Sequence, residues 1–174
     1  MQQALAILEF ALSMEKSGET FFRDAAKKVS HADAKAMFTE LADWETMHQN
    51  YISEQIQSLK EQGAWKKPAI SNEQFTQNVT SYEIFYRHES GEGAEPTLPL
   101  SERSSDLAAL RMALVIEGDL HNFYKKAITT IQDPEGKKTL QLLAEWESEH
   151  QTIIQAQYES LQHFFWSQMG FSPF

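Results

Sequence analysis

The sequence contains no cysteine. This absence excludes disulfides, thiolate metal sites, cysteine nucleophiles and cysteine-ligated iron centres. Basic residues are also few, because 15 lysines and arginines stand against 25 acidic residues, and the formal net charge is −10. A surface that binds nucleic acid needs clustered basic side chains, so we expect no nucleic-acid partner. A negative charge of this size is compatible with the attraction of metal cations.

Long apolar runs are absent as well. No stretch reaches the roughly 20 apolar residues that cross a bilayer, and residues 1–19 lack the basic start and apolar centre of a secretory signal. We therefore expect a cytoplasmic protein without a transmembrane segment. Hydrophobic residues make up 41% and charged residues 23% of the chain, which is typical of a single globular domain over residues 1–174.

An internal repeat relates the two halves of the chain at a shift of 102 residues. The segment LADWETMH ends at His48, and LAEWESEH ends at His150. An earlier segment in each half follows the same shift, so that Glu15 corresponds to Glu117. Two segments that repeat in one register without a gap indicate two copies of one structural unit.

Each copy has the periodicity of two amphipathic helices. Apolar residues recur at three-, four- and seven-residue spacings in four segments of roughly 25–30 residues. The sequence predicts one helical hairpin at about 2–63 and a second at about 104–165. Asp133 and Pro134 supply an N-cap and a first-turn proline for the fourth helix.

A long connection at about 64–103 separates the hairpins. The spacing of Phe75, Val79, Tyr82 and Tyr86 predicts a short amphipathic helix inside it. A connection of this length is typical of an all-α antiparallel four-helix bundle with a crossover between its second and third helices. Either Ser104 or Ser105 is expected to cap the third helix.

Six polar side chains interrupt the apolar stripes of these helices at one level. A Glu-x-x-His pair lies on one helix face, with Cβ atoms about 5–6 Å apart, and in a four-helix bundle such faces converge on the axis. Four buried carboxylates are costly without countercharge, and two divalent cations would balance them. Carboxylate and imidazole ligands suit iron or manganese. The predicted metal ligands are Glu15, Glu45, His48, Glu117, Glu147 and His150.

An alternative interpretation is a repeat with a satisfied polar core and no metal. A single glutamate in a helix is usually solvated, and a lone Glu-x-x-His pair occurs often by chance. The recurrence of all six residues at matched levels favours the metal site.

Both hairpins resemble the rubrerythrin-like branch of the ferritin-like superfamily. The resemblance rests on SMEKSGETFF and VIEGDLHNFY in the first and third helices, and on DWETMH and EWESEH in the second and fourth. It implies a ferritin-like bundle, a pair of bound irons and a homodimer. The implied roles are terminal carboxylates for Glu15 and Glu117, bridging carboxylates for Glu45 and Glu147, and nitrogen ligands for His48 and His150.

Two departures from the rubrerythrin pattern bear on activity. A further glutamate one turn after the third-helix ligand is replaced by Leu120, and the chain has no cysteine for the usual cysteine-ligated iron domain. We expect two iron ions, with manganese or zinc as alternatives, in an oxidoreductase that reacts ferrous iron with O2 or peroxide and uses an unidentified electron donor. The alternative is a non-catalytic protein that binds or delivers iron, or whose di-metal site is structural.

Five residues near the predicted ligands have two interpretations each. His121 either contributes to the site or lies outside it, at the surface or behind a ligand, which is the favoured interpretation. Tyr51 and Tyr124 either assist the site, by donating hydrogen bonds around the ligands or by carrying a radical, or they pack in the core. Trp44 and Trp146 either shield the site or pack, and packing is the favoured interpretation for all four.

An aromatic tail occupies residues 166–174. It could dock a partner or a membrane, although packing across the bundle end or against a second copy is the favoured interpretation.

Overall fold

A computed structural model of the chain describes residues 1–67, 100–168 and 170. These residues form four long helices and no strand. None of the four helices is apolar enough over a sufficient length to cross a membrane. The helices are α1 (Gln2–Lys28), α2 (Ala32–Gln62), α4 (Leu100–Thr130) and α5 (Pro134–Gln168).

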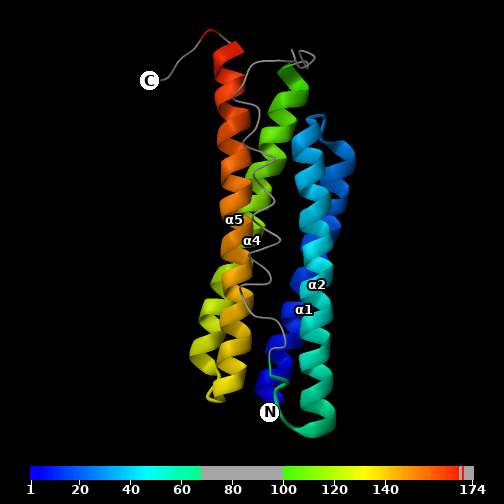
Figure 1. The fold of residues 1–174 in the computed structure, drawn as a ribbon, viewed down its shortest axis with the longest axis vertical. Coiled ribbons are helices and arrows are strands. Elements are labelled where there is room, and N and C mark those ends of the chain that lie inside the picture. Colours follow the sequence, from blue (N-terminus) through cyan, green and yellow to red (C-terminus); the bar gives the residue numbers. More distant parts are fainter. Residues whose placement is uncertain (68–99, 169, 171–174) are drawn as a thin grey trace.

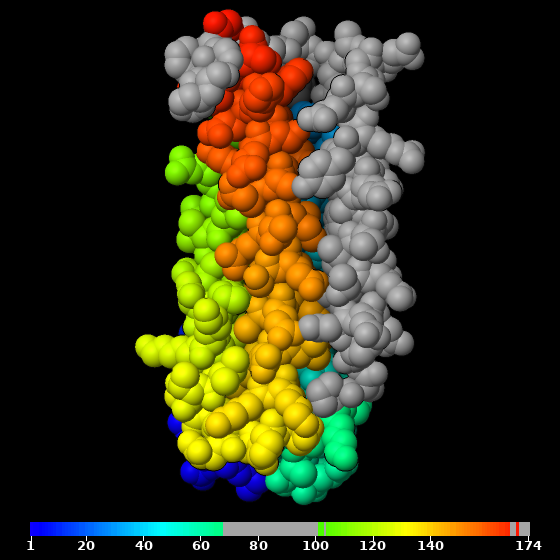
Figure 2. All heavy atoms as spheres, turned by 60° about the vertical axis from the view of Figure 1, so that its left-hand side comes forward, coloured from blue at the N-terminus to red at the C-terminus, as the bar shows by residue number. Residues whose placement is uncertain are grey.

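The helices pair as two hairpins that lie side by side along one long axis (Figure 1). α1 packs with α2, and α4 packs with α5, which Figure 2 shows along the length of one side. α2 ends at the opposite end of the bundle from the start of α4, so α2 and α4 run in the same direction (Figure 1). The prediction of an all-α antiparallel four-helix bundle is therefore confirmed.

Local sequence signals end and begin the helices. α2 is followed by the capping residue Gly63, whose φ of 69° is readily adopted only by glycine and whose N–H donates to the Leu59 carbonyl at 3.2 Å. α5 begins at Pro134, and Asp133 Oδ1 accepts hydrogen bonds from the backbone N–H groups of Glu135 and Gly136 at 2.9 and 3.0 Å. The predicted cap of this helix is confirmed.

The predicted serine cap of the third helix is wrong. α4 begins at Leu100, so Ser104 and Ser105 lie inside it. Ser104 donates from its hydroxyl to the Ser101 carbonyl at 3.0 Å. Because a serine hydroxyl can bond back to the preceding turn, its presence does not by itself start a helix. The short helix predicted around Phe75–Tyr86 lies outside the described residues.

The break between α1 and α2 is held by a residue from the other hairpin. Asp106 on α4 is 1% exposed, and its carboxylate accepts hydrogen bonds from the backbone N–H groups of Ser30 at 3.1 Å and His31 at 2.9 Å. Both N–H groups lie just before the first residue of α2, where the chain has left α1, and the carboxylate accepts from both of them. The contact fastens the two hairpins together.

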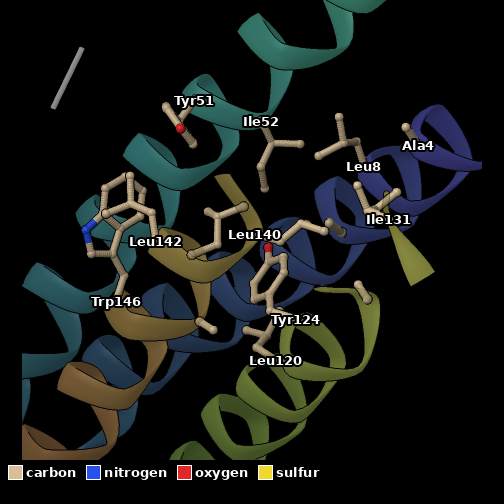
Figure 3. Close-up of a cluster of buried hydrophobic side chains, with 14 of the residues drawn as sticks. Ala4, Leu8, Tyr51, Ile52, Leu120, Tyr124, Ile131, Leu140, Leu142 and Trp146 are labelled. Carbon is tan, nitrogen blue, oxygen red and sulfur yellow. The ribbon is translucent and has the colours of Figure 1, made fainter. Parts of the chain in front are cut away.

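The apolar core consists of two clusters of buried side chains. The first contains Ala11 and Tyr124, and Figure 3 shows several of its members. The second contains Ala113 and Phe22. In the sequence repeat, Ala11 corresponds to Ala113 and Phe22 to Tyr124. The residues of one cluster are therefore the repeat equivalents of those in the other, with the two hairpins interchanged. The bundle therefore has an approximate twofold symmetry that relates one hairpin to the other.

Candidate metal centre

The six predicted ligands converge in the bundle interior. On α1, Glu15 lies between Ala11 of the first apolar cluster and Phe22 of the second, which places the polar level between the clusters. Every side chain of the set is 0% exposed. One residue each comes from α1 and α4, and a Glu-x-x-His pair each comes from α2 and α5. The structure therefore brings together Glu15, Glu45, His48, Glu117, Glu147 and His150.

Two glutamates each lie against both imidazoles. Glu45 places Oε2 at 3.9 Å from His48 Nδ1 and Oε1 at 3.6 Å from His150 Nδ1. Glu147 places Oε1 at 3.1 Å from His48 Nδ1 and Oε2 at 3.5 Å from His150 Nδ1. The ligand atoms of these four residues lie within 4.8 Å of one another and could hold metal ions. A carboxylate that directs each oxygen toward a different imidazole has the arrangement of a bridge between two centres.

The other two glutamates each lie beside one imidazole only. Glu15 Oε2 lies 3.3 Å from His48 Nδ1, and Glu117 Oε1 lies 3.3 Å from His150 Nδ1. The site thus divides into two half-sites that share Glu45 and Glu147. Each half-site has one imidazole, one carboxylate of its own and two shared carboxylates.

Burial and crowding shift the ionisation of these side chains. Burial raises the pKa of the Glu45 and Glu117 carboxyls well above their usual range. Burial lowers the pKa of His48, but Glu147 and Glu15 outweigh this effect and raise it to about 9. Burial opposes the ionisation of Glu147, but the His48 imidazole holds its pKa below the usual range. The metal-free site therefore keeps protons on groups that must lose them to bind a metal.

Four aromatic rings form a stack across the two half-sites. The rings of His48 and His150 have centroids 5.0 Å apart and are inclined by 8°. Trp146 stacks on His48, and Trp44 stacks on His150, each with centroids 4.9 Å apart. Trp146 directly precedes Glu147 in one hairpin and covers His48 of the other hairpin, and Trp44 directly precedes Glu45 and covers His150 in the same way. The tryptophans therefore fix the imidazole planes as well as covering them.

Comparison with known proteins agrees with this architecture. Residues 3–160 match the profile of the ferritin-like domain. The chain belongs to the ferritin-like domain family. Among solved structures, it is similar to a hypothetical protein from Pyrococcus furiosus, with a TM-score of 0.65 and 19% sequence identity over 92% of this chain and 91% of that one. No curated protein sequence matches.

Two tyrosines of this ferritin-like domain contact the site in different ways: one bonds to a predicted ligand, and the other packs against a tryptophan that covers an imidazole. Tyr124 on α4 donates a hydrogen bond from its hydroxyl to Glu15 Oε1 on α1, and Figure 3 shows its ring among the apolar residues of the first cluster. Tyr51 packs edge-on against Trp146, with ring centroids 5.4 Å apart. Of the two interpretations considered from the sequence, hydrogen bonding describes Tyr124 and packing describes Tyr51.

His121 does not join the six. Its Nδ1 donates to the Ala144 carbonyl at 2.7 Å, so it links α4 to α5 beside the site. Sequence reasoning overlooked Gln151, whose side-chain amide donates to the Glu117 carbonyl at 3.3 Å. Gln151 directly follows one Glu-x-x-His pair, and Gln49 follows the other at the same place in the repeat. This recurrence was the signal in the sequence that could have identified Gln151.

Proposed function

We propose that this ferritin-like domain binds two metal ions, specifically iron, and oxidises Fe(II) with O2 or peroxide. The bridging arrangement of Glu45 and Glu147 between His48 and His150 carries the proposal. A polar core that needed only internal satisfaction would pair each carboxylate with hydrogen-bond donors. Here four buried carboxylates lie against one another and share the two imidazoles of His48 and His150.

The donor set fits two divalent ions. Four carboxylates carry four negative charges when ionised, and two divalent cations neutralise them. Imidazole nitrogen with carboxylate oxygen is the donor mixture of iron and manganese sites in four-helix bundles. One position would take Glu15 and His48, the other would take Glu117 and His150, and both would share the two bridging glutamates.

The residues around the site suit chemistry that must be kept from water. Two ferrous ions, when bound, would supply the electrons that reduce O2 or peroxide. The apolar clusters on both sides exclude bulk water, and the tryptophan rings cover the imidazoles. Tyr124 holds one carboxylate in a fixed orientation through its hydroxyl.

Complete burial favours a second candidate function. Because all six side chains are 0% exposed, a substrate reaches them only when the bundle moves. A protein that binds or delivers iron, or that uses metal to fasten its hairpins together, has no such requirement. Metal that binds only the folded state stabilises that state by mass action.

Metal content and oxidation kinetics test these functions in sequence. Elemental analysis of protein from cells grown without excess metal should give two metal ions per chain. The anaerobic Fe(II) protein is then mixed with O2 or with peroxide, and the growth of ferric absorption is followed by stopped flow. We expect oxidation to be faster than that of free Fe(II), and this advantage to disappear in Glu147→Gln.

Each result selects one interpretation. Two bound ions with oxidation no faster than free Fe(II) would reject the oxidoreductase and retain the binding function. Fewer than one ion per chain, even after incubation with Fe(II) or Mn(II), would reject the metal site.

A further inference from the structure

The two half-sites are built from equivalent residues. Glu15 with His48 and Glu117 with His150 are related by the sequence repeat, and both pairs have the same 3.3 Å separation. Both half-sites share the same bridging carboxylates. On these residues alone, the two metal positions would have equal affinity.

One substitution within the repeat breaks this equivalence. Tyr124, seven residues after Glu117, donates its hydroxyl to Glu15 across the bundle. The corresponding position, seven residues after Glu15, is Phe22. A phenylalanine ring has no donor, so Glu117 has no counterpart of the hydrogen bond that Glu15 accepts from Tyr124.

The packing shows that Phe22 and Tyr124 occupy equivalent places. Tyr124 belongs to the same cluster as Ala11, the residue one turn before Glu15. Phe22 belongs to the same cluster as Ala113, one turn before Glu117. Both aromatic side chains are 0% exposed. At this matched position the two half-sites therefore differ by one hydroxyl group.

We infer that the two metal positions are inequivalent, and that Tyr124 makes the position of Glu15 and His48 the one that fills first. This inference rests on the proposed di-metal function. A ligand carboxylate that is already oriented by a hydrogen bond loses less freedom when it binds a metal, and such outer contacts typically change metal affinity by about 10–100-fold. Glu117 lacks this support, so its position binds the more weakly held ion.

Titration of the full chain with Co²⁺, followed by visible absorption, measures each position separately. Glu117→Gln leaves the Glu15 position intact, and Glu15→Gln leaves the Glu117 position intact. We expect the Glu117→Gln protein to bind its first ion about 10-fold more tightly than the Glu15→Gln protein. Adding Tyr124→Phe should weaken binding about 10-fold in the first background and leave the second unchanged.

The reciprocal change, Phe22→Tyr, provides an independent test. In the Glu15→Gln background it places a hydroxyl at the position matched to Tyr124, and binding at the Glu117 position should become about 10-fold tighter. Circular dichroism of each metal-free variant checks that it folds, since a loss of packing would weaken both positions together.

The outcomes separate this inference from the proposed function. Equal losses from Tyr124→Phe in both backgrounds, no loss in either, or no gain from Phe22→Tyr would overturn the inequivalence. A chain of unaltered sequence that binds no Co²⁺ would instead overturn the metal site itself.

Discussion

Glu45 and Glu147 occupy the same place in the two hairpins, yet their neutral substitutions should affect the metal-free protein differently. With both imidazoles protonated, four ionised carboxylates would exceed the positive charge by two. Burial and then Glu15 raise the pKa of Glu45, whereas His48 holds the pKa of Glu147 low. Glu45→Gln therefore removes a carboxylate whose ionised form is destabilised when no metal is bound. Glu147→Gln instead removes the main countercharge of the imidazoles.

The distances give the size of the difference. Glu147 lies 3.1 Å from His48 Nδ1, whereas Glu45 lies 3.9 Å away. The distances to His150 are nearly equal, at 3.5 and 3.6 Å. With an effective dielectric constant of about 20, these separations correspond to a difference of about 1 kcal/mol in attraction. The melting temperature of metal-free Glu147→Gln should accordingly lie about 2–4 °C below that of Glu45→Gln.

Metal should affect the two variants alike. For the unaltered chain, free metal at about 1,000 times its dissociation constant adds about 4 kcal/mol to the free energy of unfolding. That gain corresponds to a rise of about 8–16 °C in a domain of this size. Because both glutamates would bridge the two ions, each variant should lose most of this rise.

Differential scanning calorimetry at pH 7, with chelator and with added Co²⁺, measures both quantities. Glu40→Gln is a matched control, because Glu40 is an exposed glutamate on α2 and its substitution should change neither value appreciably. A metal-free Glu147→Gln protein more stable than Glu45→Gln would refute the charge argument. Retention of the full metal-induced rise by either variant would refute its role as a bridge.

Three further predictions concern the pH dependence of metal affinity, the pH dependence of stability and the contact of Asp106 between the hairpins. Metal affinity should increase from pH 6 to 8 with release of protons, because Glu147 and Glu15 outweigh burial and raise the pKa of His48 to about 9. Calorimetric titration in buffers of different ionisation enthalpy measures the affinity and the number of protons released. An affinity that stays constant with pH would contradict the prediction. The same shift stabilises the metal-free fold fully below about pH 6.5, and this contribution is lost as pH rises through about 9. Asp106→Ala should lower the free energy of unfolding by about 1–2 kcal/mol, since two N–H groups before α2 lose their acceptor. Asp106→Asn keeps an acceptor oxygen and should retain part of this stabilisation. Equal melting temperatures for the two variants would count against this role of Asp106.

The repeat made most of the architecture predictable. Helical periodicity indicated the four helices, and the fixed shift indicated which polar residues lie at one level. Asp133 and Pro134 marked the start of α5 because their signal is local and acts within four residues. The convergence of the six polar residues followed from the same reasoning, since a polar residue on an apolar stripe points to the bundle interior.

Contacts between the hairpins were beyond sequence reasoning. Asp106 caps a break 75 residues earlier in the chain, and nothing near Asp106 in sequence announces its partner. The hydroxyl of Tyr124 donates to a residue 109 positions away, and sequence reasoning had favoured packing in the core over a hydrogen bond. At Ser104 the local sequence was misleading, because a residue typical of a helix cap lies inside a helix that had already begun.

The site that gives this bundle its proposed function also works against its metal-free stability. Apolar residues at the same six positions would pack without the cost of buried charge, and replacing buried ionic groups in this way is often neutral or stabilising by about 1–4 kcal/mol. A fold maintained only for its own stability has no need of Glu45 and Glu117, whose pKa values are raised by burial. Bound metal would remove this conflict by displacing the protons and supplying the missing positive charge. Occupancy and stability are then coupled, and a chain whose melting temperature ignores metal would contradict the physical basis of the site.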